Sequence, residues 1–270
     1  MSLDSYFKQI FKEEYGKNSW EIIPSYKVGT LPLEIDLVIK HTDGDSIKEF
    51  WKGYHEAGQL LEILEFKSAV DRFPEEIVHK LRGYMAFYWQ NIKLSLGKEG
   101  TSAGWIISSI KPQWFEKKVK KGLFKAKANG LYQWNGPEKI NVLLINEMPL
   151  QREYYPFLLF SSGKKLRDFI KEISLTRGEE KFQSMVFLLY HQVVLAMAES
   201  KEIPYYDPDQ SIREAIAYIG LKKVIEQVGM KEVIDAVGVK EVLKIFTLEE
   251  RIAGLTPEEK AKLKKLLEEE

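Results

Sequence analysis

The segment LEILEFKSAV, residues 61–70, carries Glu65 and Lys67 inside an apolar run that is typical of a buried β-strand. In a strand, side chains two residues apart project from the same face, so Glu65 and Lys67 would lie side by side on an interior surface. Burial of charged groups is unfavourable unless they are paired or bind an ion. This pair is therefore the first candidate for a functional site.

The E-x-K pattern alone is uninformative because it recurs along the chain. It begins at five glutamates: Glu65, Glu116, Glu179, Glu199 and Glu258. Only the copy at Glu65 lies in a strand-like apolar run. The preceding segment LPLEIDLVIK (31–40) also reads as a strand, and Asp36 interrupts its apolar residues. If the two strands pair, two carboxylates and one lysine meet at one end of a sheet.

Two carboxylates and a lysine suit the hydrolysis of a phosphodiester. Mg²⁺ prefers oxygen ligands and keeps several waters, so two carboxylates are a typical protein contribution. The cation polarises the phosphate and generates or orients hydroxide, while a nearby lysine positions water or stabilises negative charge. Lysine also offsets the repulsion between the carboxylates. The same residue types would equally form a buried ion network without catalysis, and spacing alone leaves both interpretations open.

Composition limits the class of protein. The 270 residues, 44% of them hydrophobic, suffice for one large domain or for a domain with an appendage. The absence of cysteine excludes disulfides and cysteine zinc sites and favours a reducing, cytoplasmic location. Because 40 basic residues balance 40 acidic ones, a nucleic-acid surface would have to be a local patch. No apolar run or signal-peptide core predicts a membrane association.

The expected elements of residues 1–110 follow the order helix, strand, strand, strand, helix, strand. The first helix is expected over 4–15, with Asp4 as a candidate N-cap. The second helix follows Pro74, which suits a first helical turn. The strands are expected at 20–28, 32–41, 61–69 and 102–110. The polar stretch 41–58 is expected to be a turn or an insertion.

The middle of the chain continues with a mixture of strands and helices. Asn129-Gly130 predicts a hairpin. Strands are expected at 140–148 and in YPFLLF (155–160), followed by a helix from about Ser162 and a long apolar helix over 181–200.

The last part of the chain contains a short repeat. GLKKVIEQV, GMKEVIDAV and GVKEVLKIF begin at Gly220, Gly229 and Gly238, a period of nine residues. Each unit predicts a short helical turn ended by the next glycine, and units of this size must pack on each other or on a larger domain. We therefore expect a main domain over 1–202 and a helical packing or interaction appendage over 210–270.

The order of elements, with Asp36 on the second strand and E-x-K on the third, resembles the PD-(D/E)XK nuclease superfamily. The second half, from EYYPFLLFSSGKKLRDFIKEI (153–173) through the glycine-spaced units to LEERIAGLTPEE (248–259), resembles the Rpn family of recombination-promoting nucleases and transposase-like proteins. The resemblance covers nearly the whole chain. It implies an α/β fold with a restriction-endonuclease-like core, a central mixed sheet, extra strands and a C-terminal helical repeat tail.

The resemblance also implies roles for individual residues. Asp36, Glu65 and Lys67 match the acidic, acidic and lysine positions of the motif, and the main-chain carbonyl of Phe66 would help to hold the metal. A further acid on the first helix often belongs to such sites; Glu14 is preferred to Glu13 because it lies nearer the apolar helix face. The chain departs from the pattern in having Glu34-Ile35 before Asp36, with Pro32 displaced upstream, and a long stretch between the two acids.

The activity implied is that of a DNA endonuclease dependent on Mg²⁺ or another divalent cation such as Mn²⁺ or Ca²⁺, linked to recombination or mobile elements. A homodimer formed through the tail or the core would suit cleavage of both DNA strands, because a twofold axis would relate two sites. The competing hypothesis is a catalytically inactive nuclease-fold module that binds DNA or a protein partner.

The densest basic segment is KPQWFEKKVKKGLFKAK, residues 111–127. Lysines can neutralise DNA phosphates without reading sequence, although a solvated hairpin would explain the same composition. The candidate contacts in this segment are Lys117, Lys118, Lys120 and Lys121. On the helix after the site strand, Lys80 and Arg82 either contact phosphate or pair with nearby acids.

Overall fold

The computed structural model describes residues 3–15, 21–27, 34–40, 59–96, 101–203 and 208–238. Contacts within the chain divide it into two units, Met1–Phe169 and Ile170–Glu270. This division falls earlier than the boundary expected near residue 202 from the sequence, so the sequence-based domain limits remain a prediction. The polar stretch 41–58 lies outside the described residues.

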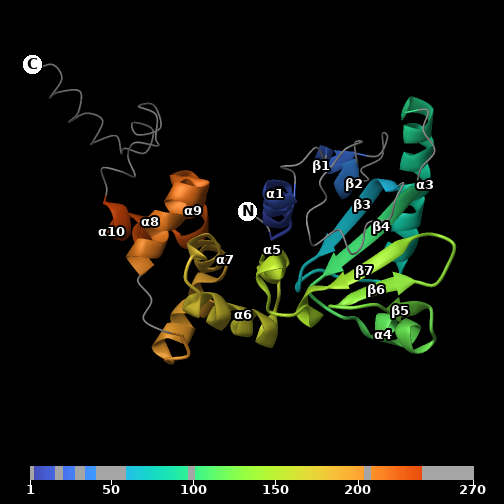
Figure 1. Cartoon of the computed structure of the whole chain (residues 1–270). Coiled ribbons are helices and arrows are strands. Elements are labelled where there is room, and N and C mark those ends of the chain that lie inside the picture. Colours follow the sequence, from blue (N-terminus) through green and yellow to red (C-terminus); the bar gives the residue numbers. More distant parts are fainter. Residues whose placement is uncertain are drawn as a thin grey trace, which may run out of the picture. The chain divides into compact units, whose positions relative to one another are not determined.

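The first unit is built on a seven-stranded mixed sheet with the order β1-β2-β3-β4-β7-β6-β5 (Figure 1). The strands are β1 (Glu21–Lys27), β2 (Glu34–Lys40), β3 (Gln59–Lys67), β4 (Thr101–Ser108), β5 (Phe124–Ala126), β6 (Leu131–Trp134) and β7 (Ile140–Leu144). β4 pairs in parallel with both β3 and β7, and the other neighbours are antiparallel. The expected α/β class with a mixed sheet is therefore confirmed.

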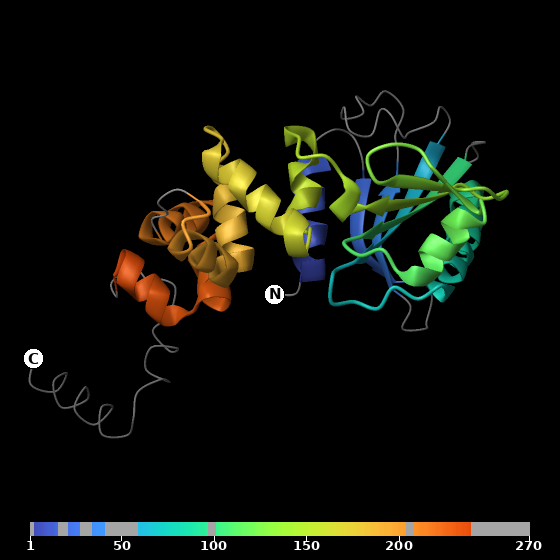
Figure 2. The same ribbon diagram turned by 90° about the horizontal axis from the view of Figure 1, so that it is seen from below.

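Helices cover both faces of this sheet (Figures 1 and 2). One face carries α1 (Leu3–Tyr15) and α5 (Tyr155–Leu158), and the opposite face carries α3 (Glu76–Leu96) and α4 (Gln113–Lys120). The parallel strands β3 and β4 are consequently apolar on both sides, as the run of fully buried Ile63, Leu64, Ile106 and Ile107 shows. The sequence-based prediction of the first part of the chain is confirmed for the helix over 4–15, for the helix after Pro74 and for the strands β1 to β4.

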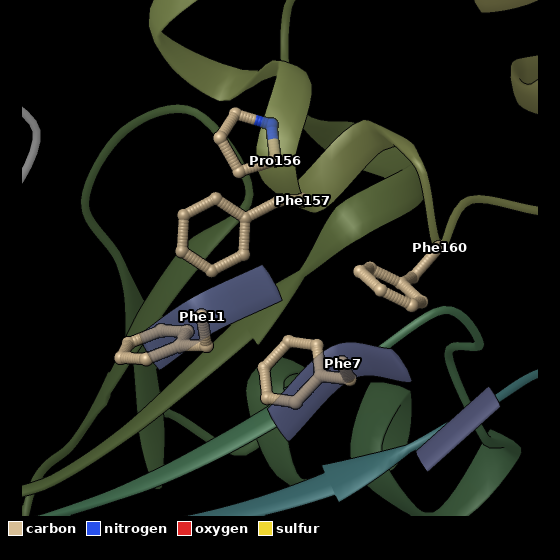
Figure 3. A pocket seen from close by; sticks show the side chains of 5 residues that line it. All are labelled: Phe7, Phe11, Pro156, Phe157 and Phe160. Atoms are coloured by element: carbon tan, nitrogen blue, oxygen red, sulfur yellow. The ribbon is translucent and has the colours of Figure 1, made fainter. Parts of the chain in front are cut away.

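A cluster of aromatic side chains holds α1 and α5 against the end of β3. A small apolar pocket in this cluster is lined by Phe7, Phe11, Pro156, Phe157 and Phe160 (Figure 3). Phe66 of β3 stacks on Phe7 with ring centroids 4.1 Å apart. Because the lining is apolar and its side chains are buried, we interpret the pocket as a packing site that fixes the position of Phe66.

The expected strand in YPFLLF is wrong, because residues 155–158 form helix α5. It follows two 3₁₀ turns, Ile145–Glu147 and Arg152–Tyr154. A short apolar run fits a buried strand and a buried helix equally well. Pro156 favours the helix, since a proline in the first helical turn loses no hydrogen bond.

The hairpin at Asn129-Gly130 is confirmed, and both residues have positive φ, 52° and 77°. Helix α4 was not expected in the basic segment before it. Its helical spacing brings Phe115 and Val119 to the core side, and Pro112 stands at its N-cap.

The second unit is helical. α6 (Gly163–Leu175) crosses the boundary between the units, and α7 (Glu180–Glu199) matches the expected long helix but has non-helical dihedral angles at Tyr190. It is followed by α8 (Pro208–Ile219), α9 (Leu221–Val228) and α10 (Met230–Val237). α9 and α10 are the first two glycine-spaced segments; the third lies outside the described residues. In the described part of the chain, no helix has the length and apolar character needed to cross a membrane.

Candidate functional site

The strands β2 and β3 bring Asp36 next to Glu65. Their antiparallel register runs from Lys40 opposite Leu61 to Leu37 opposite Leu64. Beyond this point the Phe66 backbone N–H donates to Asp36 Oδ2, at 2.8 Å. The Asp36 carboxylate thus supplies the acceptor for this N–H and lies against the peptide that joins Glu65 to Phe66.

Glu65 is the buried centre of the site, with 3% of its surface exposed. Its Oε1 accepts hydrogen bonds from Lys67 Nζ at 3.0 Å and from Lys80 Nζ at 2.9 Å. Its Oε2 is buried and has no hydrogen-bond partner among the described residues. A buried carboxylate oxygen without a partner is unfavourable, so a further ligand that reached this atom would relieve that cost.

Helix α1 contributes a lysine that sequence reasoning missed. Lys8 Nζ lies 3.3 Å from Asp36 Oδ1 and 2.9 Å from Asp4 Oδ2. Asp4, expected as an N-cap, instead lies in the first turn of α1. The signal available in the sequence was the i, i+4 spacing of Asp4 and Lys8 beside the apolar face of the helix.

The electrostatics place Asp4 close to the site. Burial raises the pKa of Asp4, and the charge of Asp36 adds to this, while Lys8 and Lys67 oppose it. Burial alone would lower the pKa of Lys8, but the hydrogen bond to Asp4 and the charge of Asp36 raise it overall.

Glu14 was the acid of the first helix favoured by sequence, and its role remains a prediction. It follows Asp4 by ten residues, which is about 15 Å along a helix axis. Its neighbour Glu13 accepts a hydrogen bond from Gln9 at 2.7 Å. Asp4 is therefore the better candidate for an α1 carboxylate that acts with Asp36.

Lys80 and Arg82 of α3, both predicted to contact phosphate or nearby acids, have carboxylate partners from other elements. Lys80 binds Glu65, and the same ammonium lies 5.2 Å from the centre of the Tyr84 ring. Arg82 forms an ion pair with Glu138. Lys80 is thus part of the Glu65 site. The sequence did not predict this contact, because the two residues are 15 positions apart along the chain.

The charges of this cluster balance. Three carboxylates face three lysines: Asp4, Asp36 and Glu65 with Lys8, Lys67 and Lys80. The described residues contain no group of three or more acidic or histidine side chains that could hold a metal. Two carboxylates completed by water still meet the requirement of Mg²⁺, and the unpartnered Oε2 fits such a ligand. The Phe66 carbonyl as a third ligand remains a prediction.

Of the four lysines predicted in the basic segment to bind nucleic acid, one has an acidic partner and three have no partner among the described residues. Lys118 Nζ lies 2.6 Å from Glu75 Oε1. In the described part of the chain, the exposed side chains without a hydrogen-bond or ion-pair partner include Lys117, Lys120 and Lys121.

Comparison of the chain with protein-family models, with curated proteins and with solved structures gave no match. The resemblance to PD-(D/E)XK nucleases and to the Rpn family therefore depends on the sequence features alone and stays a prediction.

Proposed function

We propose that this chain is a divalent-metal-dependent DNA endonuclease with a restriction-endonuclease-like core. Asp36 and Glu65 bind the cation, and Lys67 acts on the attacking water or on the phosphate. The observation that supports this most is the buried Oε2 of Glu65, which has no partner in the described residues although Oε1 of the same carboxylate has two. When bound, the cation polarises the scissile phosphate and activates water.

The protein's own residues share the remaining work. The Phe66 N–H and Lys8 hold the two oxygens of Asp36 in one orientation. Lys80 keeps Glu65 neutralised, so Lys67 can leave Oε1 and donate to a water or a phosphate oxygen. Lys80 is thus a positioning residue in this proposal.

A specific observation favours a second function, a catalytically inactive module that binds DNA or a protein. Because three lysines already neutralise the three carboxylates, a complete ion network could stabilise the sheet without any cation. In that case the charged site only stabilises the fold, and the protein acts by binding DNA or a protein through its surface.

Nicking of supercoiled plasmid distinguishes the two functions. The nuclease requires Mg²⁺ or Mn²⁺, is inhibited by EDTA, and loses at least about 100-fold in rate in Asp36→Ala and Lys67→Ala. Glu138→Gln, which removes an ion pair outside the site, is the matched control and keeps its rate. Nicking by Asp36→Ala at the wild-type rate would eliminate the endonuclease proposal.

A second measurement tests cation binding without activity. At a cation concentration ten times the Kd, binding to the folded state stabilises it by about 1.4 kcal/mol. We expect Mg²⁺ to raise the unfolding temperature of the wild type and to have no effect on Glu65→Gln. An equal shift in both proteins would place the cation elsewhere.

We propose that the chain forms a homodimer through the predicted appendage over 210–270, which includes α9 and α10, or through the core. Light scattering of the full chain and of a chain ending at residue 203 tests this. A monomeric full chain would contradict the homodimer, and a truncated chain that remains dimeric would assign the interface to the core.

A further inference from the structure

Helix α4 is attached to the loop that follows the site strand. Lys67, the last residue of β3, pairs with Ser108, the last residue of β4, so both parallel strands end at one edge of the sheet. The loop after β3 and helix α4 after β4 therefore start from the same edge. Trp114 Nε1 donates to the Phe73 carbonyl oxygen at 2.6 Å, and the two rings meet edge to face.

The loop itself is a closed turn with an exposed apolar tip. Ser68 N and Oγ both donate to Asp71 Oδ2, at 2.8 and 2.7 Å. Asp71 N donates back to the Ser68 carbonyl oxygen at 3.2 Å. Val70, between them, is 87% exposed. These hydrogen bonds hold an apolar side chain in water three residues after Lys67, where it gains nothing for the fold.

Helix α4, which contacts the loop through Trp114, and the loop itself both carry exposed basic side chains. Buried Phe115 anchors α4 and leaves its opposite side to solvent. We call the set of Lys117, Lys120 and Lys121 the α4 lysine face; all three are exposed and lack partners within the described residues. Arg72 in the loop is exposed as well.

We propose that the Ser68–Arg72 turn and the α4 lysine face together bind duplex DNA beside the scissile phosphate. Val70 contacts the sugar and base surface of the minor groove as an apolar wedge, and the lysines neutralise backbone phosphates. The positive charges of the α4 lysine face favour a polyanion such as DNA as the molecule bound at this surface. This inference rests on the proposed nuclease function and names the surface by which the substrate is held.

The dimensions agree with this arrangement. Three residues of extended chain span at most about 11 Å, which limits the distance from Lys67 to Val70. At 3.4 Å per base pair, this is about three base pairs. The turn is therefore short enough for Val70 to contact the groove next to a phosphate held by Lys67.

Fluorescence anisotropy with a labelled duplex in EDTA measures binding by the full chain without hydrolysis. We expect the Lys117→Gln/Lys120→Gln/Lys121→Gln variant to bind roughly 100- to 500-fold more weakly at about 0.1 M salt, with a log–log salt slope reduced by about 2–3. Val70→Ala should bind about three- to tenfold more weakly with an unchanged salt slope, because it removes an apolar contact.

Matched controls carry the same chemical changes elsewhere. Leu175→Ala truncates another exposed apolar side chain, which is 72% exposed. The charge control changes three exposed lysines to glutamine: Lys164, Lys201 and Lys231. Both controls should bind DNA like the wild type, and circular dichroism should show that every variant is folded.

The outcomes separate this inference from the proposed function. If the charge control weakens DNA binding as much as the α4 variant does, the proposed binding surface is refuted. It is also refuted if the wild-type protein does not bind the duplex even at low salt. If Val70→Ala binds DNA with wild-type affinity, the proposal that Val70 contacts the minor groove is refuted. The exposed Val70 side chain would then be assigned to contact with a protein partner. Failure of the wild type to nick plasmid, with these binding differences intact, refutes catalysis and supports the surface.

Discussion

Replacing Lys80 with methionine should lower the free energy of unfolding of the first unit by about 1–2 kcal/mol. The change leaves the buried Glu65 carboxylate with one of its two ammonium partners. A hydrogen bond to a charged group contributes about 1.5–3 kcal/mol. The Lys80 side chain is 39% exposed, and solvent screening reduces the value expected for it. Because Lys67 remains, the larger loss caused by an unpaired buried charge is avoided.

Denaturant unfolding followed by tryptophan fluorescence measures this change. All six tryptophans lie within Met1–Phe169, so the signal reports on the first unit. A double-mutant cycle with Glu65→Gln should give a coupling free energy of about 1–2 kcal/mol. The matched control is the pair of Lys118 with Glu75, whose carboxylate side chain is 43% exposed and whose coupling should stay below about 1 kcal/mol. A Lys80–Glu65 coupling no larger than the control would refute the argument that burial of Glu65 strengthens the pair.

The same pair predicts a dependence of stability on alkaline pH. Burial would lower the pKa of Lys80, but the hydrogen bond and charge of Glu65 raise it above the ordinary value of 10.5. Because the folded pKa exceeds the unfolded one, the stabilisation is complete below pH 10.5 and is lost as the pH rises through the folded value. Wild type should therefore lose more stability above pH 10.5 than Lys80→Met, and identical slopes would contradict this linkage.

Three further predictions concern positions away from the site. Gly130→Ala should destabilise the first unit by about 2–3 kcal/mol in the same assay, because φ is 77° and an added Cβ would overlap the Leu144 carbonyl oxygen; Gly83→Ala, in open space on α3, should instead stabilise it by about 0.5–1 kcal/mol. Burial lowers the pKa of His191 while Glu232 opposes the shift, so its stabilisation is present above pH 6.5 and is lost as the pH falls through the folded pKa. Circular dichroism should show a smaller acid-side loss of stability in His191→Gln, and an unchanged loss would exclude His191 as its cause.

Local patterns in the sequence were sufficient for most elements of the first unit. The strand with Glu65 and Lys67 on one face follows from the two-residue period of side chains, which is a property of the backbone alone. The hairpin at Asn129-Gly130 follows from two residues that tolerate positive φ. The prediction of a strand in YPFLLF was wrong because a short, fully apolar run has no period that separates a strand from a helix.

The sequence by itself identified Asp36, Glu65 and Lys67 as charged residues inside apolar strands. Only the tertiary structure decided which partners they have. Lys8 and Lys80 come from helices on opposite faces of the sheet, and both reach these carboxylates because α1 and α3 pack there. No local period encodes such contacts, since they depend on how distant elements pack. The same packing leaves Glu65 Oε2 buried without a partner in the described residues, the feature on which the proposed function depends.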